Sequence, residues 1–555
     1  MKKRLFAQSL VLGLLITAAV AVQAAAVPQE GIKNTLTSGV VLEIAKPTFE
    51  KTEMTDANPG RQLNYFLKIA AVIEEKNREK PFNLFGNQVK GKIARWLTSA
   101  SEIESQDCFK KYLQELAENI RERGRFSVEL PPWVSLEQNP AELVFPRADR
   151  YSAAILVLQT FFNLSTGIHQ WGKGHFFDAF VYVNNPGDTR KFKEYTGVFS
   201  LMQDHLYALS VLSRSRQEIS YSPAAPVFKI SQLVFASQPE IRGMTLVYPD
   251  IDDAVAVAVA VQDPAAGKYK TEGEGDFKIV VFKNLAEAYF EGVLKPISAS
   301  VLTAEQVWSL DADVYISNLI MRRIAHHLGP VFVIAPKGQE RAGGDGGAGG
   351  TKQGKQAQKE NIEMELKTIP EILGNLFPVV EAVKSQAAAL YSTPVLINNG
   401  LLPDDKAMTV YLTYLVTLID RLRTPPPEMA STQQPGKKNW DELLADPGNV
   451  DYLADLIQFN YLLGKETILL NIGNRTLDID RVKFETAVGE LTGEVARIMT
   501  YPNYDSARLF IEKNSALPPQ LGEILKSVSG IPSQVEFRLE KPEIKEAEEL
   551  KENKQ

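Results

Sequence analysis

The sequence predicts an α+β protein with a mostly helical second half and a smaller β-rich region before it. Beyond Leu285 the pattern is mainly helical, whereas residues 227–284 hold several short segments rich in β-branched and aromatic residues. The chain has 555 residues and 44% hydrophobic content, enough for a globular protein of two or more domains. We expect an N-terminal mixed region over 28–300, a helical region over 301–538 and a charged tail over 539–555.

The first 24 residues are typical of a bacterial secretory signal peptide. Lys2, Lys3 and Arg4 form a basic segment, an apolar run extends from Val11 to Val22, and small residues allow cleavage after Ala24. The apolar run is about half as long as a membrane-spanning helix. We expect a periplasmic or secreted protein without a membrane anchor after cleavage; the alternative is an uncleaved anchor.

Cysteine content and net charge narrow the possible classes of protein. Cys108 is the only cysteine, so the chain has neither an internal disulfide nor a Cys-rich metal site. The formal net charge is −7, and it becomes −10 without the three basic residues of the signal segment. This acidity favours solubility and gives no indication of nucleic-acid binding. No pattern sets the oligomeric state.

Helices are predicted before residue 220 from apolar residues that recur at three- and four-residue steps. In the first of them Leu63, Phe66, Leu67 and Ala70 form such a stripe. The predicted helices cover residues 62–79, 104–123, 151–165 and 196–217, after loops and short strands over 28–60.

Strands are predicted in the β-rich part, about residues 227–284. The expected strands are Val227–Ile230, Met244–Tyr248 and Lys278–Phe282. The run Ala254–Val261 alternates Ala and Val, so both faces are apolar, which favours a buried strand; a buried helix is the alternative.

Two segments of the second half have the composition of linkers. Residues 342–359 are rich in Gly but lack the G-x-x-x-x-G-K-[ST] pattern of a phosphate-binding loop, so we expect a flexible surface loop. A second linker begins at Pro425 and extends to about Gly436.

The stretch Ser317–Pro330 looks like a zinc-protease helix that has lost a zinc ligand and its general base. The zinc motif reads H-E-x-x-H, with two His ligands one turn apart and a Glu as general base. In that frame Arg322 stands at the first His, Arg323 at the Glu, and only His326 keeps its identity. Because an arginine stays charged, it cannot become a metal ligand. The alternative is an ordinary surface or ion-paired patch.

Three segments resemble the dipeptidyl-peptidase III family of zinc metallopeptidases, most closely its bacterial relatives with H-E-x-x-H-G-L-G-P. Ile324–Pro330 keeps the end of that motif. Val380–Tyr391 matches the frame of the family's E-E-A-K-A-D-x-x-G-L-Y helix, and Ile457–Leu463 contains Q-F-N-Y-L. The similarity covers about residues 240–538.

The resemblance implies that the zinc site has changed at several positions. Ala382 takes the place of the third ligand, a Glu, while Glu381 keeps the neighbouring acid. Asp451 takes the place of a His that is thought to contact the substrate. With one His of three ligands left, no zinc and no other cofactor is expected. We predict that Arg322 and Glu381 form an ion pair within about 4 Å.

The resemblance also implies a two-lobed fold whose cleft binds peptides in extended form, partly by adding a strand to a sheet edge. Such binding rests on main-chain hydrogen bonds, which do not need zinc. The leading hypothesis is therefore an exported, non-catalytic relative that binds a peptide or protein partner.

Two other functions stay open. One is an active peptidase or hydrolase with zinc at a non-standard site formed by His326, His327 and Glu381. Adjacent histidines on a helix diverge by about 100°, so they chelate one ion poorly. The other is a periplasmic structural or assembly protein. His169 and His175 lie six residues apart, a spacing that does not suit a metal pair.

Overall fold

The structure is a computed structural model. It describes residues 40–44, 57–79, 86–123, 153–162, 165–166, 169–170, 174–209, 227–236, 241–242, 247–248, 278–330, 332–336, 364–426, 443–444, 447–471, 476–533, 535–542 and 544. The described residues from Val41 onward belong to one compact unit.

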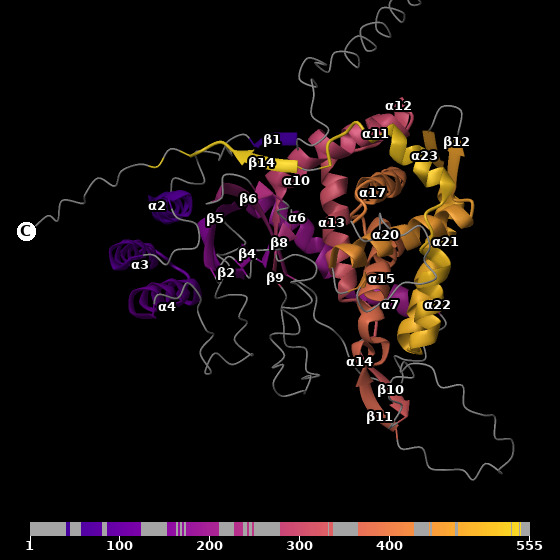
Figure 1. Cartoon of the computed structure of the whole chain (residues 1–555), viewed down its shortest axis with the longest axis horizontal. Helices are drawn as coiled ribbons and strands as arrows, with labels where there is room; N and C mark the ends of the chain where they lie inside the picture. Colours follow the sequence, from indigo (N-terminus) through magenta and orange to yellow (C-terminus); the bar gives the residue numbers. More distant parts are fainter. Residues whose placement is uncertain are drawn as a thin grey trace, which may run out of the picture. The chain divides into compact units, whose positions relative to one another are not determined.

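A five-stranded mixed sheet is the main β-structure (Figure 1). Its order is β2-β5-β6-β9-β8; β6 and β9 run parallel, and the other neighbours are antiparallel. The strands are β2 (Ala153–Phe162), β5 (Gly174–Asn184), β6 (Val227–Ala236), β9 (Lys278–Phe282) and β8 (Val247–Tyr248).

Three N-terminal helices pack with this sheet: α2 (Ala57–Glu79), α3 (Asn87–Glu102) and α4 (Asp107–Arg123). Helix α2 lies against β2, β5 and β6, and α3 packs on both α2 and α4. Phe66, Phe109 and Val181 are fully buried in one shared hydrophobic core, which holds these helices to the sheet.

Short ladders complete the β-structure. The pairs are β3 (Ser165–Thr166) with β4 (His169–Gln170), β10 (Phe332–Pro336) with β11 (Met364–Thr368), and β12 (Ile468–Asn471) with β13 (Thr476–Ile479). A three-stranded sheet has the order β1 (Val40–Ile44), β14 (Val535–Leu539), β7 (Ile241–Arg242).

The remaining described chain is mostly helical. Its helices are α6 (Pro186–Gly197), α7 (Phe199–Tyr207), α10 (Lys283–Tyr289), η2 (Phe290–Leu294), α11 (Lys295–Val301), α12 (Ala304–Ser309), α13 (Ala312–His326), α14 (Ile369–Leu373), η3 (Gly374–Leu376), α15 (Phe377–Tyr391), α16 (Thr393–Asn398), η4 (Asp404–Lys406), α17 (Ala407–Leu422), α20 (Pro447–Gly464), α21 (Arg481–Thr500), α22 (Tyr504–Asn514) and α23 (Pro519–Ser527).

Helix α15 is the central element of the helical part. It contacts α13, α20 and α21, and α13 in turn contacts α17 (Figure 1). Val380 and Val383 belong to one hydrophobic core, and Ala388 and Leu390 belong to another. Because both faces of α15 are buried, its polar residues must find partners inside the protein.

The predicted α+β class is confirmed, and most predicted elements are found. Residues 62–79 lie within α2, residues 107–123 form α4, and α7 covers the first part of the helix expected over 196–217. The strands expected at 227–230 and 278–282 are present, and Val247–Tyr248 is a strand within the third expected segment.

The helix predicted over residues 151–165 is wrong, because Ala153–Phe162 forms strand β2. A continuous apolar run suits a buried helix and a buried strand equally. Here β5 decides: it pairs antiparallel with β2 from Ala153↔Val183 to Phe162↔Gly174. That partner lies too far along the chain for local periodicity to reveal it.

Other predictions fall on residues outside the described ranges. These are the signal peptide over 1–24, the Ala/Val run over 254–261, the Gly-rich loop over 342–359, and most of the Pro425 linker and the charged tail. The predicted domain limits stay predictions. None of the helices in the described ranges is long and apolar enough to cross a membrane.

Candidate functional site

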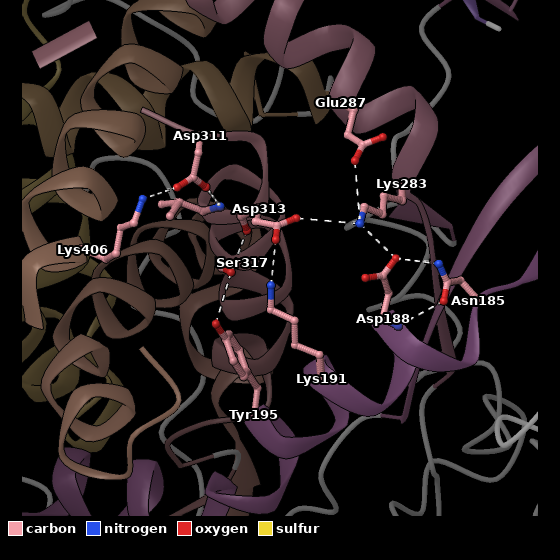
Figure 2. Close-up of polar contacts among 11 residues, drawn as sticks. Asn185, Asp188, Lys191, Tyr195, Lys283, Glu287, Asp311, Asp313, Ser317 and Lys406 are labelled. Atoms are coloured by element: carbon pink, nitrogen blue, oxygen red, sulfur yellow. Dashed lines mark hydrogen bonds and ion pairs between the residues drawn. The ribbon is translucent and has the colours of Figure 1, made fainter. Parts of the chain in front are cut away.

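The start of helix α13 is fixed by a network of polar contacts (Figure 2). Asp311 caps the helix by accepting from the backbone N–H of Val314 at 2.7 Å, and Lys406 binds the same carboxylate at 2.5 Å. Two residues later, Asp313 pairs with Lys191 of α6 at 2.7 Å. The helix that carries the predicted site residues therefore begins at a defined place.

Two further contacts tie α13 to its surroundings. Lys283 of α10 lies 2.9 Å from Asp188 and 3.8 Å from Asp313 (Figure 2). The hydroxyl groups of Tyr195 and Ser317 lie 3.2 Å apart in a buried position. Half-exposed ion pairs add little stability one by one, so we read this network as orienting α13 rather than as a main source of stability.

The other end of α13 is held by a buried lysine of α15. The ammonium group of Lys384 donates to the backbone carbonyls of Ala325, His326 and Leu328 at 3.1, 3.1 and 2.8 Å. The carbonyls of Ala325 and His326 belong to the last turn of α13 and that of Leu328 follows it, in a region where backbone acceptors lack helical partners and the helix dipole is negative. The Lys384 side chain is only 5% exposed, so it joins the two helices inside the protein.

Glu381 forms an ion pair with this lysine. Its Oε1 lies 2.7 Å from Lys384 Nζ and 3.2 Å from Nδ1 of His326. Burial raises the pKa of Glu381, and the neighbouring ammonium opposes that rise. The structure thus brings together Glu381 and His326, two of the three residues of the alternative metal site.

Both histidines at the end of α13 are kept neutral. Burial, followed by the positive charges of Lys384 and Arg322, lowers the pKa of His326 well below its usual range. Burial and the neighbouring His326 lower the pKa of His327 to about 3. The Nε2 atom of His326 is buried and has no hydrogen-bond partner among the residues that the structure describes.

The predicted ion pair between Arg322 and Glu381 is wrong. Arg322 instead donates to Asp451 of α20, with 2.8 Å between Nη2 and Oδ1. Glu381 is already engaged by Lys384, one turn further along its own helix. Asp451 is the residue predicted to replace the substrate-contacting His, so the structure links two of the changed positions directly.

A second arginine–aspartate pair lies one turn further along α20. Arg421 of α17 binds Asp455 at 3.2 Å, and Asp455 is completely buried. Burial would raise the pKa of Asp451, but Arg322 and Arg421 together lower it. The predicted site residues did not include Lys384, Arg421 or Asp455. The four-residue spacing of Asp451 and Asp455 on one helix face was the available signal for the last of these.

The other predicted site residues are also buried. Arg323 and Ala382 are each 5% exposed, and Ala382 packs in the core around Val380. Among the remaining histidines, His169 lies in β4 and His175 in β5. The ring of His205 stacks on Tyr391, with 4.3 Å between ring centres.

The donor set around His326 does not fit a zinc ion. Zinc sites in proteins use three or four N, O or S ligands. Here one imidazole and one carboxylate are close together, the carboxylate is held by Lys384, and Arg322 adds a second positive charge. Within the described ranges, no three His, Cys, Asp or Glu side chains are arranged to hold a metal.

These features define a class of protein: an α+β scaffold whose buried site, on helices α13, α15 and α20, is built from ion pairs. The fold itself is like that of dipeptidyl-peptidase III. The enzyme structure from Caldithrix abyssi matches with a TM-score of 0.55 and 17% identity, over 82% of this chain and 71% of that chain. The structure from Corallococcus sp. strain EGB gives 0.52 and 17%, over 81% and 68%.

Sequence comparison finds a protein with a different name. Nudix hydrolase 3 of Arabidopsis thaliana is 21% identical over 440 residues, which are 79% of this chain. The chain spans about half the length of that protein, 46%. No protein-family model matches the sequence.

Proposed function

We propose that this chain is an exported, non-catalytic relative of the zinc dipeptidyl-peptidases that binds a peptide or a protein partner. One observation carries the proposal. Arg322, which aligns with the first zinc ligand of the family, is 8% exposed and forms a 2.8 Å ion pair with Asp451. A guanidinium held in this way supplies positive charge to a site that would otherwise bind a cation.

The other changed positions support the same reading. Arg323 stands where the family has the general base, so no carboxylate is present there to take a proton from water. Ala382 stands at the third ligand and has no donor atom. Peptide binding through main-chain hydrogen bonds depends on none of these three residues.

The test uses the purified full chain and an active zinc dipeptidyl-peptidase as the positive control. Metal content is measured after dialysis against zinc, and hydrolysis and binding are measured with peptides of two to eight residues. We expect zinc far below one ion per chain, no hydrolysis, and saturable binding of at least one peptide class. Stoichiometric zinc together with turnover would overturn the proposal, and no binding of any peptide would leave the structural role as the better reading.

One observation favours the alternative of a metal-dependent hydrolase at His326, His327 and Glu381. His326 and His327 are neutral at pH 7, and Nε2 of His326 has no partner in the described part of the chain, so it is free to ligate. Under this alternative, His326→Ala abolishes any hydrolysis that the wild type shows. Unchanged activity in that variant would reject the site.

Export is a separate part of the proposal, since it rests on residues 1–24. Expression of the full sequence in a Gram-negative host should give a periplasmic protein whose intact mass corresponds to cleavage after Ala24. A full-length mass in the cytoplasmic fraction would contradict export without affecting the site.

A further inference from the structure

A cavity of about 40 Å³ lies beside the ion pairs, between helices α13, α15, α16 and α17. That volume is enough for roughly three water molecules, or for a small organic molecule of about the same bulk. The cavity is separate from the contacts of Glu381 and His326, because neither residue lines it. It shares Arg322 with the site described above.

The walls of the cavity are mainly apolar. Leu319 and Met321 come from α13, Leu390 from α15 and Val410 from α17. Apolar walls favour the aliphatic part of a ligand, because its transfer from water is favourable.

One part of the wall is cationic. Arg322 and Arg421 both line the cavity, whereas no Asp or Glu does. Their partners, Asp451 and Asp455, lie outside the lining, so the positive groups are nearer to a bound molecule than the acids that balance them. At short range this arrangement favours an anion over a neutral or cationic group.

Two donors at this wall are unused. The Nε–H of Arg322 is buried without a hydrogen-bond partner in the described part of the chain, and Arg322 is 8% exposed. Tyr315 is 4% exposed, lines the cavity, and interacts through charge with Arg421 and with Asp420, which does not line it. No hydrogen bond to its hydroxyl group is present among the described residues. Buried donors of this kind normally find an acceptor, either water or a ligand.

We propose that this cavity binds a small aliphatic monocarboxylate, with the carboxylate at Arg322 and Tyr315 and the alkyl part against Leu319, Met321 and Val410. The volume limits the ligand to roughly three to five carbon atoms. The carboxylate accepts from the Nε–H of Arg322 and from the hydroxyl of Tyr315, which are charge-assisted hydrogen bonds. The inference goes beyond the proposed peptide binding and does not depend on it.

The test uses butyrate as the probe and the purified full chain, with binding followed by ligand-observed saturation-transfer NMR. Butyramide and butylammonium, at the same concentration and ionic strength, replace the carboxylate by a neutral and a cationic group. We expect saturable butyrate binding in the millimolar range, which is reasonable for a ligand of about six non-hydrogen atoms. Both other probes should bind at least about tenfold more weakly.

The deciding variant is Tyr315→Phe. It removes only a hydroxyl that has no hydrogen bond to any described residue, so the thermal midpoint should stay close to that of the wild type while butyrate binding weakens about tenfold. Tyr452→Phe is the matched control, because Tyr452 is also buried, its hydroxyl has no hydrogen bond within the described ranges, and it does not line the cavity. That variant should bind butyrate like the wild type.

A second variant, Val410→Phe, places bulk in the cavity and should abolish butyrate binding in a chain that remains folded by circular dichroism. The proposal is overturned if butyrate does not bind, if butyramide binds equally well, or if Tyr315→Phe leaves the butyrate affinity unchanged. Peptide binding is not measured in any of these experiments, so their failure would leave the proposed function untouched.

Discussion

At the scale of single residues, the ion pair between Arg322 and Asp451 is unequal. Arg322 is 8% exposed, whereas the side chain of Asp451 is 42% exposed. An unpaired charge costs most where water cannot reach it. Loss of the ion pair should therefore cost more free energy when Arg322 is left unpaired than when Asp451 is.

This inequality predicts different costs for removing each member. Asp451→Ala leaves a buried guanidinium and should lower the free energy of unfolding by about 2–4 kcal/mol. Arg322→Met leaves a carboxylate that water reaches and should cost only about 1 kcal/mol. Urea unfolding of both variants at pH 7 checks the order. Equal costs would mean that Asp455 and the other neighbours already balance Arg322.

The neutral histidines predict a loss of stability in acid. The pKa of His327 is lowered to about 3 from an ordinary value of 6.5, so below pH 6.5 the unfolded chain binds a proton that the folded chain does not. The contribution is complete above pH 6.5 and is lost as the pH falls toward 3. His326 acts in the same direction. Each histidine contributes a slope that approaches about 1.4 kcal/mol per pH unit.

The measurement is the free energy of unfolding in urea between pH 7.5 and 4.5, for the wild type and His327→Gln. The variant should show the shallower dependence below pH 6, by up to about 1.4 kcal/mol per unit. The raised pKa of Glu381 works in the opposite direction in both proteins, and because His327 acts on Glu381, the comparison measures His327 together with its effect on that acid. Parallel curves would show that His327 is protonated in the folded state.

At the scale of elements, Lys384 joins the end of α13 to the middle of α15. Its ammonium group serves three backbone carbonyls and one carboxylate, with 5% of the side chain exposed. Removing it leaves three backbone carbonyls at the end of α13 without their donor and leaves Glu381 as an unpaired buried acid. Both losses weaken the contact between α13 and α15.

Lys384→Met should therefore lower the free energy of unfolding by about 3–5 kcal/mol. The matched control is Lys526→Met: Lys526 also pairs with a Glu three residues earlier, Glu523, but both side chains are more than half exposed. That variant should change stability by less than about 0.5 kcal/mol. Guanidinium unfolding measures both, and similar values would show that the lysine does not join the helices. Adding Glu381→Gln to Lys384→Met should recover part of the loss.

The elements also show where sequence patterns were sufficient. Helices α2 and α4 were predictable because their apolar stripes and polar faces are local properties. Strand β2 was not, since its partner β5 is a separate segment, and a run such as Ile155–Phe162 reads the same way in a helix. Periodicity identifies an element only when one of its faces is polar.

At the scale of the whole molecule, the sequence predicted the α+β class, and the resemblance predicted a dipeptidyl-peptidase III-like fold. It also led to the residues that gather at the site. It did not predict their pairing, since Arg322 binds Asp451 and Glu381 binds Lys384. A choice between two acids at similar range depends on side-chain geometry, which residue identity and spacing do not contain.

The fold makes a reversal of the proposed loss testable. If α13 and α15 keep the arrangement of an active enzyme, the triple variant Arg322→His, Arg323→Glu, Ala382→Glu supplies the missing ligands and base. We expect it to retain close to one zinc ion per chain after dialysis, measured by mass spectrometry of the metal, whereas the wild type retains far less. Two imidazoles one helical turn apart and a carboxylate from the facing helix are a sufficient set for zinc.

The double variant Arg322→His, Ala382→Glu is the control that separates binding from chemistry. It should also hold zinc, but it lacks the carboxylate that accepts a proton from metal-bound water, so any peptide hydrolysis should appear only in the triple variant. Asp451 is half exposed and loses its cationic partner in both variants. The loss of that ion pair therefore lowers the free energy of unfolding by the same amount in each. If neither folded variant holds zinc, α13 and α15 are not spaced as the metal requires, and the ancestry of the site would have to be reconsidered.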